Sequence, residues 1–154
     1  MTDLRPLEAR ELARIPGLHL LTHVGPLRTT EDGGGTRHEA EGIVHVAPDC
    51  PLARGRSEFS HVIFLEASNN LSHWITHQVP AVADRVFKVA TAFPRGMGLP
   101  PVSLGTDVRV RGEVYFQKNG DRWRGETTVR FYRPDGTLAE TVNFPLIERT
   151  AAPG

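Results

Sequence analysis

The chain of 154 residues is long enough for one hydrophobic core and short for two, so we expect a single domain over residues 1–154. Its 18 Lys and Arg balance 18 Asp and Glu, which leaves no net charge to attract nucleic acid or a membrane surface. The single cysteine excludes an internal disulfide. No apolar run reaches the roughly 18 residues of a membrane-spanning helix, and the N-terminus lacks the apolar core of a signal peptide. We therefore expect a cytoplasmic protein.

The N-terminal third predicts a short helix followed by a strand pair. Residues 7–15 have the pattern of an amphipathic helix ended by Pro16 and Gly17, which makes residues 1–17 a helical arm. Residues 18–27 and 36–46 predict two antiparallel strands. The segment TTEDGGG between them predicts a flexible hairpin loop.

One long helix is the central feature of the predicted structure. Residues 58–80 are the only long segment with helical periodicity, with Ser57 and Ser60 as candidate N-caps and Pro80 as the stop. Positions on one side predict a buried apolar face: Phe64, Ala67, Leu71, Trp74 and Ile75.

A second side of this helix carries polar side chains at spacings of three and four residues: Glu66, Asn69, Asn70, His73 and His77. A side facing open water would be expected to carry Lys, Arg and more Glu. The Asn and His residues therefore favour a narrow or partly covered site. The alternative is an ordinary solvated amphipathic helix.

Beyond Pro80 the pattern predicts strands. Candidates cover residues 85–93, 107–117, 122–133 and 137–148, with turns at 118–121 and 133–136 and a flexible tail at 150–154. A sheet with one apolar face needs a cover, and only the central helix is long enough to provide it. The sequence thus predicts an α+β protein with the hot-dog fold, a curved antiparallel β-sheet wrapped around one long central α-helix.

Two family resemblances lie in this helix and its approach. The stretch from Phe59 to Leu71 resembles the motif F-N-x-V-x-x-x-x-x-x-N-Q-L of the FcoT-like acyl thioesterases, a hot-dog family. Asn69 matches that family's active-site asparagine, whereas Ser60 replaces a second asparagine and Leu52 stands near a tyrosine. The resemblance implies a homodimer or a dimer of dimers, with the site at the dimer interface.

The second resemblance is to the hydroxyacyl dehydratases of fatty-acid synthesis. Their V-L-x-x-E-A turn is similar to the residues from Val62 to Ala67, and Glu66 matches the catalytic glutamate. The partner histidine expected about fourteen residues earlier is again Leu52, which disfavours ordinary 3-hydroxyacyl dehydration because that reaction needs both an acid and a base.

These resemblances imply roles for residues of this chain. Glu66 is the candidate general base, and Asn69 would orient the nucleophile or the thioester oxygen. Further catalytic candidates are Ser60 and His61. The candidates for substrate binding are Asn70, His73, Arg54, Arg56 and Arg95. The three arginines would bind the phosphates of coenzyme A (CoA) or of a carrier-protein phosphopantetheine. We expect no metal at His73 and His77, because further ligands do not accompany them, and no cofactor beyond the thioester carrier.

The expected function is that of an enzyme acting on a fatty acyl thioester, in natural-product or lipid biosynthesis. The FcoT-like resemblance implies conjugate addition of glycine to the β-carbon of a 2-enoyl thioester, thioester hydrolysis, or both. The substrate would be carried by CoA or an acyl carrier protein. The alternatives are a simple thioesterase, a hydratase or dehydratase, and a non-catalytic acyl-ligand binder.

Overall fold

The computed structural model describes residues 3–89 and 101–149. The described elements, in chain order, are β1 (Arg5–Pro6), α1 (Ala9–Arg14), β2 (Leu21–Val24), β3 (Arg28–Asp32), β4 (Gly35–His45), the 3-10 helix η1 (Pro51–Ala53), α2 (His61–Gln78), β5 (Phe87–Val89), β6 (Asp107–Asn119), β7 (Arg122–Tyr132) and β8 (Leu138–Glu148). The strands form one antiparallel sheet of order β1-β2-β4-β6-β7-β8-β5, and β3 pairs with β4 off this path.

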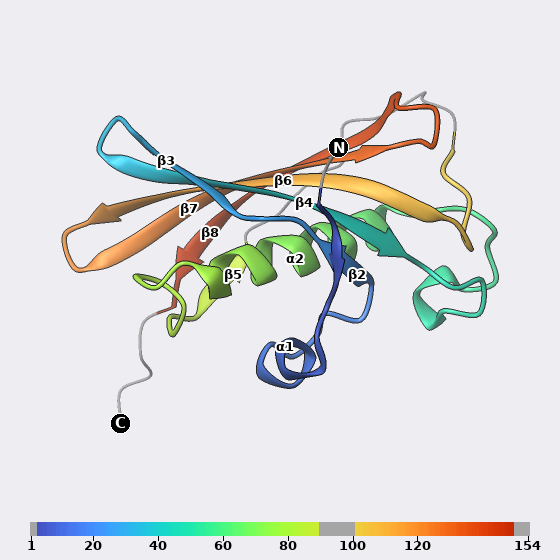
Figure 1. Cartoon of the computed structure of the whole chain (residues 1–154), viewed down its shortest axis with the longest axis horizontal. Coiled ribbons are helices and arrows are strands. Elements are labelled where there is room, and N and C mark those ends of the chain that lie inside the picture. The colour runs from blue at the N-terminus through green and yellow to red at the C-terminus, as the bar shows by residue number, and fades with distance from the viewer. Residues whose placement is uncertain (1–2, 90–100, 150–154) are drawn as a thin grey trace.

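The helix α2 lies along the concave side of this sheet (Figure 1). It contacts β2, β4, β6, β7 and β8, so strands from across the sheet reach the same helix and the sheet must curve around it. This confirms the predicted α+β class and the predicted arrangement. Among the described helices, none has the length and apolarity that crossing a lipid bilayer would require.

Alternating side chains divide each long strand into a core face and an outer face. In β6 the buried positions are those predicted from the sequence: Val108, Val110, Gly112, Val114 and Phe116. They pack against the apolar side of α2, whose predicted residues are all buried. Leu71 approaches Gly112 so closely that a Cβ built at that glycine would lie 2.6 Å from the leucine Cδ2.

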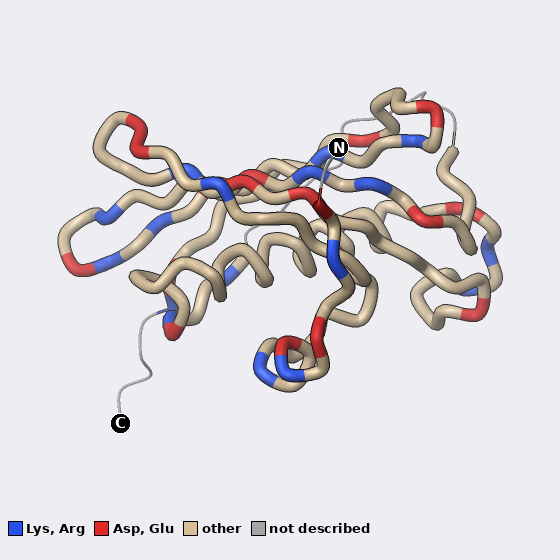
Figure 2. Tube along the Cα trace, viewed as in Figure 1, with Lys and Arg blue, Asp and Glu red and all other residues tan. Residues whose placement is uncertain are grey.

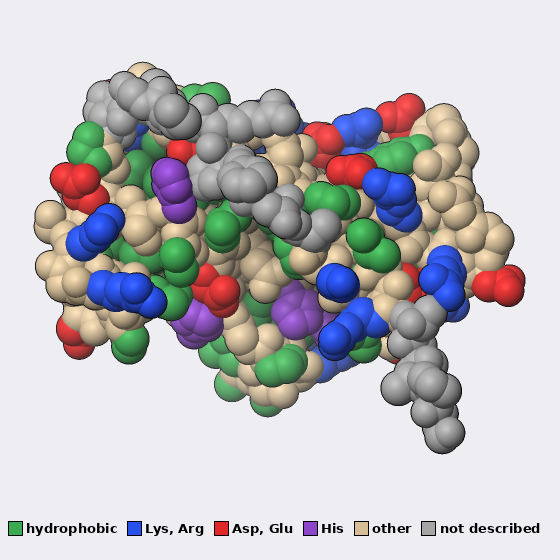
Figure 3. Space-filling view, turned by 180° about the vertical axis from the view of Figure 1, so that it is seen from behind, with side chains coloured by type: hydrophobic (Ala, Val, Ile, Leu, Met, Phe, Trp, Pro, Cys, Tyr) green, Lys and Arg blue, Asp and Glu red, His purple; other side chains and the backbone are tan. Residues whose placement is uncertain are grey.

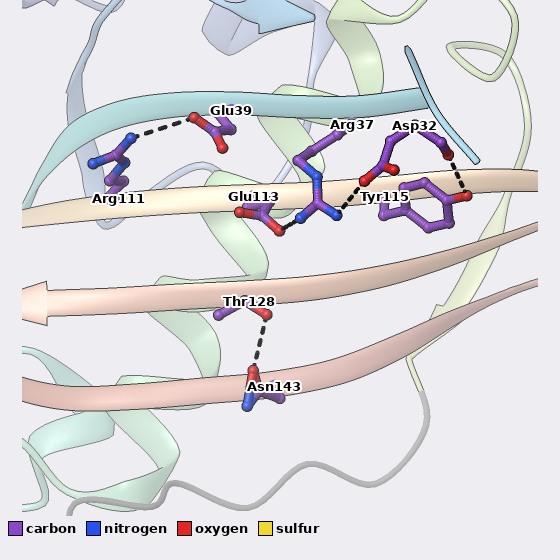
Figure 4. Close-up of polar contacts among 8 residues, drawn as sticks. All are labelled: Asp32, Arg37, Glu39, Arg111, Glu113, Tyr115, Thr128 and Asn143. Atoms are coloured by element: carbon purple, nitrogen blue, oxygen red, sulfur yellow. Dashed lines mark hydrogen bonds and ion pairs between the residues drawn. The ribbon is translucent and has the colours of Figure 1, made fainter. Parts of the chain in front are cut away.

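The outer face of the sheet carries paired polar side chains. Both signs of charge are interleaved over the strands (Figure 2). Arg37 is ion-paired with Asp32 and Glu113, Arg111 with Glu39, and Tyr115 donates to the Asp32 carbonyl (Figure 4). These pairs span β3, β4 and β6, so they fix the strands laterally on the side opposite α2.

The N-terminal half differs in one respect from the prediction. The segment expected to be a flexible loop contains β3, because residues 28–32 pair in register with residues 35–39 of β4 and only Gly33 and Gly34 make the turn. Both glycines have positive φ, which explains the glycine run. The prediction that β2 pairs with β4 is confirmed.

The predicted N-terminal helix is confirmed as α1, which lies below α2 in Figure 1, on the side away from the sheet. Glu11 of α1 accepts hydrogen bonds from Arg5 at 2.6 and 3.1 Å and from the indole N–H of Trp74 at 2.9 Å. These contacts tie the arm to the C-terminal part of α2. The predicted flexible tail at 150–154 lies outside the described residues, as does the last part of the strand predicted at 85–93.

Candidate active site

One side of α2 is left open by the sheet. Its residues Glu66, Asn69, His73 and His77 are all partly exposed and follow one another at spacings of three and four, so they form a line along the helix. We call this line the polar row. Figure 3 shows histidine side chains at several places on one face of the molecule, among hydrophobic ones.

The Glu66 carboxylate lies between an amide that donates to it and an imidazole ring. Its Oε1 atom accepts a hydrogen bond of 3.3 Å from the Asn70 amide and lies 3.7 Å from His19 Nε2. The His19 Nδ1 lies 3.1 Å from the Gly17 carbonyl, which only accepts, so Nδ1 carries a hydrogen. In the neutral ring Nε2 is then a free acceptor, and both it and Glu66 face the same space as proton acceptors.

Asn70 has a different position from the substrate contact expected. Its side chain is 1% exposed. Its oxygen accepts from the Leu20 backbone N–H at 2.9 Å, and its nitrogen donates to the carbonyl and carboxylate of Glu66. Both amide hydrogens are used inside the protein, so Asn70 fixes the loop before β2 to α2 and orients Glu66 rather than facing a ligand.

A cleft of about 530 Å³ lies beside the C-terminal half of α2. We call it the flank cleft. The helix lines it with Asn69, Ser72, His73, Thr76 and His77, and the other wall is largely apolar, with Ala83, Val86, Phe87, Val89 and Leu146. Asp84 and Arg85 stand at its rim, and the guanidinium of Arg85 is ion-paired with Glu148 at 2.5 Å.

Two histidines of the polar row touch each other in this cleft. The Nε2 atoms of His73 and His77 lie 3.2 Å apart, a hydrogen bond in which one ring donates and the other accepts. Burial lowers the pKa of both rings below the usual histidine value, the adjacent His77 ring lowers that of His73 further because the two rings disfavour being charged together, and the charge of Arg14 lowers that of His77 further. The pair is therefore neutral at neutral pH.

A second cleft, of about 580 Å³, lies at the start of α2, and we call it the N-terminal cleft. It brings together four residues predicted for the site: Arg54, Arg56, Ser60 and His61. The Ser60 hydroxyl caps the helix by accepting from the Ile63 N–H at 3.3 Å, as its position in the sequence indicated. Leu52 also lines this cleft.

The structure thus divides the predicted site residues among three places. Ser60, His61 and the two arginines lie in the N-terminal cleft, Glu66 lies in the middle of α2, and Asn69 and His73 lie in the flank cleft. Arg95, predicted to bind phosphate, lies outside the described residues. In the part of the chain that the structure describes, no three His, Cys, Asp or Glu side chains form a group that would hold a metal ion.

Sequence reasoning gave no role to His19 or to the residues that form the far wall of the flank cleft. His19 stands 47 positions before Glu66, and residues 83–87 follow the helix without a motif. Their proximity to the polar row depends on how β2 and β5 join the sheet, which no local pattern records. Only the mixture of histidines within an otherwise apolar strand segment hinted at a role for His19.

The arrangement has the elements of an acyl-transfer site. A carboxylate and an imidazole nitrogen that can accept protons face one space, an amide without a protein partner in the described ranges lies next to them, and a largely apolar cleft continues from there. Chemically, this combination can activate water or an amine beside a bound acyl group.

Comparisons with known proteins support the fold. No protein-family model matches the sequence, and none of the curated proteins matches it. Solved structures do match: a candidate thioesterase, yhdA, from Lactococcus lactis (TM-score 0.55, 12% identity, covering 81% of this chain and 91% of that one) and the E. coli PaaI protein from the phenylacetic acid degradation operon (TM-score 0.52, 8% identity, covering 90% and 89%).

A third match is a hypothetical thioesterase from Streptococcus pneumoniae solved with coenzyme A (TM-score 0.50, 8% identity, covering 80% of this chain and 86% of that one). The chain therefore has the hot-dog fold, as the sequence predicted. Its structural neighbours are thioesterase-superfamily proteins, whereas the resemblance to the FcoT-like family stays a prediction.

Proposed function

We propose that this protein is an enzyme that hydrolyses an acyl thioester, with Glu66 as the general base. The observation that carries the proposal is the position of Glu66, a carboxylate oriented by Asn70 and facing His19 on the open side of the central helix. Its fold is one in which a neighbour binds coenzyme A. An oriented, partly exposed carboxylate can act as the general base that activates water for thioester hydrolysis.

The reaction divides among these groups as follows. Water approaches the thioester carbonyl while Glu66 takes its proton, and His19 Nε2, the second acceptor, holds the other water hydrogen. Asn69, one turn further along the polar row, donates from its amide to the carbonyl oxygen, where negative charge develops. The C–S bond then breaks, and the proton on Glu66 passes to the departing thiolate.

The two clefts accommodate the two ends of the substrate. The acyl chain lies in the flank cleft against Val86, Phe87 and Leu146. The CoA or phosphopantetheine arm leaves through the N-terminal cleft, where Arg54 and Arg56 meet its phosphates near the positive end of the helix dipole. His61, exposed at the first turn of α2, contacts the carrier arm rather than the reacting carbon.

A second copy of the chain would complete the site. Val62 is 56% exposed one turn before Glu66, so a homodimer packed against this side of α2 would bury it. In such a dimer, and in a dimer of dimers built from it, the polar row lies at the interface between protomers.

The addition of glycine to a 2-enoyl thioester is the second candidate reaction. It requires a cation to hold the glycine carboxylate, and Arg54 and Arg56 line a cleft with His61 and Ser60. The rim arginine of the flank cleft, Arg85, is already paired with Glu148. This placement favours hydrolysis, because Arg54 and Arg56 lie at the carrier end rather than beside Glu66.

Mass spectrometry of products from a medium-chain 2-enoyl-CoA and its saturated analogue, with and without glycine, tests the proposal. We expect free acid in every reaction and a loss of turnover of about a hundredfold or more in Glu66→Gln. A glycine-dependent adduct would show that the activity is conjugate addition instead of hydrolysis. If the wild-type protein left every substrate unchanged, the remaining interpretation would be a non-catalytic acyl-ligand binder.

The matched control is Glu39→Gln. This carboxylate lies on the outer face of the sheet and pairs with Arg111 (Figure 4), away from α2. We expect Glu39→Gln to keep wild-type turnover. Equal losses in both variants would show a general effect of lost charge instead of a role for Glu66.

A further inference from the structure

The flank cleft has a polar wall that hydrolysis of a plain fatty acyl thioester does not need. Beyond Asn69 the helix presents His73 and His77, each four residues on, or about 6 Å further along the axis. An acyl chain whose thioester carbonyl lies at Asn69 therefore passes this histidine pair several carbons further along. A cleft for hydrocarbon alone would carry Leu, Val or Phe at these positions.

Other polar groups of this wall are already satisfied. Ser72 is hydrogen-bonded to Thr127 at 3.1 Å, and Thr76 donates to the Ser72 carbonyl at 2.8 Å. In contrast, among the described residues the histidine pair has only its own mutual hydrogen bond. The Nδ1 atoms of both rings are left for a ligand.

The mutual hydrogen bond determines what these two atoms offer. One neutral ring must carry its hydrogen on Nε2 and the other must not, so the second ring carries its hydrogen on Nδ1. Whichever ring is the donor, the pair presents one Nδ1–H donor and one bare Nδ1 acceptor. A hydroxyl group, which both donates and accepts, has the matching chemistry.

The charges around the pair do not select an ion. The charge of Arg14 in α1 acts on His77, although Arg14 does not line the flank cleft, whereas Asp84 and the paired Arg85 do line it. The cleft itself therefore carries one acidic and one basic side chain, and the basic one is already ion-paired. A carboxylate on the acyl chain would be repelled by Asp84, and an ammonium group by Arg85 and by the charge of Arg14 beyond the cleft.

We propose that His73 and His77 form a specificity site for a hydroxyl group on the acyl chain, several carbons beyond the thioester, so that the preferred substrate is a hydroxyacyl thioester. This inference rests on the proposed function for the direction of the chain in the cleft. It concerns which acyl group binds and leaves the reacting groups unchanged.

The test compares CoA thioesters of equal chain length, one saturated and unsubstituted and the others with a hydroxyl at successive carbons from the middle of the chain to its end. We expect kcat/KM to favour one hydroxylated position by about tenfold, the effect of one hydrogen bond in a partly buried site. His73→Phe should remove this preference while the unsubstituted thioester is still hydrolysed, and His73→Gln should keep part of it.

His45→Phe is the matched control. This histidine pairs with Asp107 at 2.9 Å and is not part of the flank cleft, so the preference should survive. A second measurement, calorimetric binding of the free hydroxy acid, does not depend on turnover. Binding should be weakened about tenfold by His73→Phe and unaffected by His45→Phe.

The outcomes separate this inference from the proposed function. Hydrolysis of all thioesters at equal rates, unchanged in His73→Phe, would overturn the hydroxyl site and keep the enzyme. Binding of the hydroxy acid that depends on His73, without turnover of any thioester, would keep the site and overturn hydrolysis. If the hydroxy acid did not bind and no thioester were hydrolysed, both the hydroxyl site and the proposed function would be overturned.

Discussion

Asn69 and Asn70 are adjacent in the sequence, yet the structure gives them opposite environments. Asn70 is buried and accepts the Leu20 N–H, whereas Asn69 lines the flank cleft and has no hydrogen-bond partner among the described residues. One residue of helix rotation, about 100°, separates a structural side chain from a candidate catalytic one. The two asparagines therefore allow stability and activity to be tested independently.

We expect Asn70→Ala to lower the free energy of unfolding by about 1–3 kcal/mol, because the Leu20 N–H would remain buried without an acceptor. Asn69→Ala should stay within about 0.5 kcal/mol of the wild type and lose turnover instead. Urea unfolding followed by circular dichroism measures the first effect, and the thioester assay measures the second. Equal unfolding midpoints for the two variants would contradict this separation.

At the scale of elements, Ser60 links a predicted site residue to the start of α2. Its hydroxyl accepts from Ile63 N–H, and the helix that it caps carries the whole polar row. The hydroxyl has no other partner in the described ranges, so the same group is available to a ligand in the N-terminal cleft.

We expect Ser60→Ala to destabilise the protein by about 1 kcal/mol through loss of the cap, and Ser60→Asp to restore stability because aspartate caps equally well. If Ser60 only caps the helix, Ser60→Asp should also keep wild-type turnover. A variant that is stable but inactive would instead give the hydroxyl the catalytic role predicted from the sequence. Thermal unfolding and the thioester assay together distinguish these cases.

The elements that could be predicted from the sequence are those specified by local patterns. The alternation of Val108, Val110, Val114 and Phe116 defines β6, and the Asn119-Gly120 pair defines its turn, where Gly120 has a φ of 62°. Residues 28–32 carry no apolar alternation, and all of β3 is exposed. It forms a strand because β4 offers it a free edge, which is a property of the sheet and not of its own residues.

At the scale of the whole molecule, the candidate site combines segments distant in sequence. The polar row could be recognised because the helix repeat places its members together. His19, Arg14 and Asp84 reach the same region only through the folding of the chain around α2, so sequence reasoning could not assign them. The clefts likewise exist between elements, and their volumes depend on side-chain packing that no motif encodes.

The attachment of the N-terminal arm gives a prediction for the molecule as a whole. The hydrogen bond and charge of Arg5, together with the Trp74 indole, lower the pKa of Glu11 from 4.5 to about 2. The folded state thus binds this proton less readily than the unfolded chain. Glu11 stabilises the fold fully above about pH 4.5 and loses this effect as the pH falls toward 2.

Glu11→Gln should therefore be less stable than the wild type at pH 7, and the difference should shrink between pH 4.5 and 2. Trp fluorescence during urea unfolding measures this difference. The control, Glu31→Gln on exposed β3, should keep wild-type stability throughout. A Glu11→Gln deficit that stays constant across this range would show that shape rather than charge holds the arm to α2.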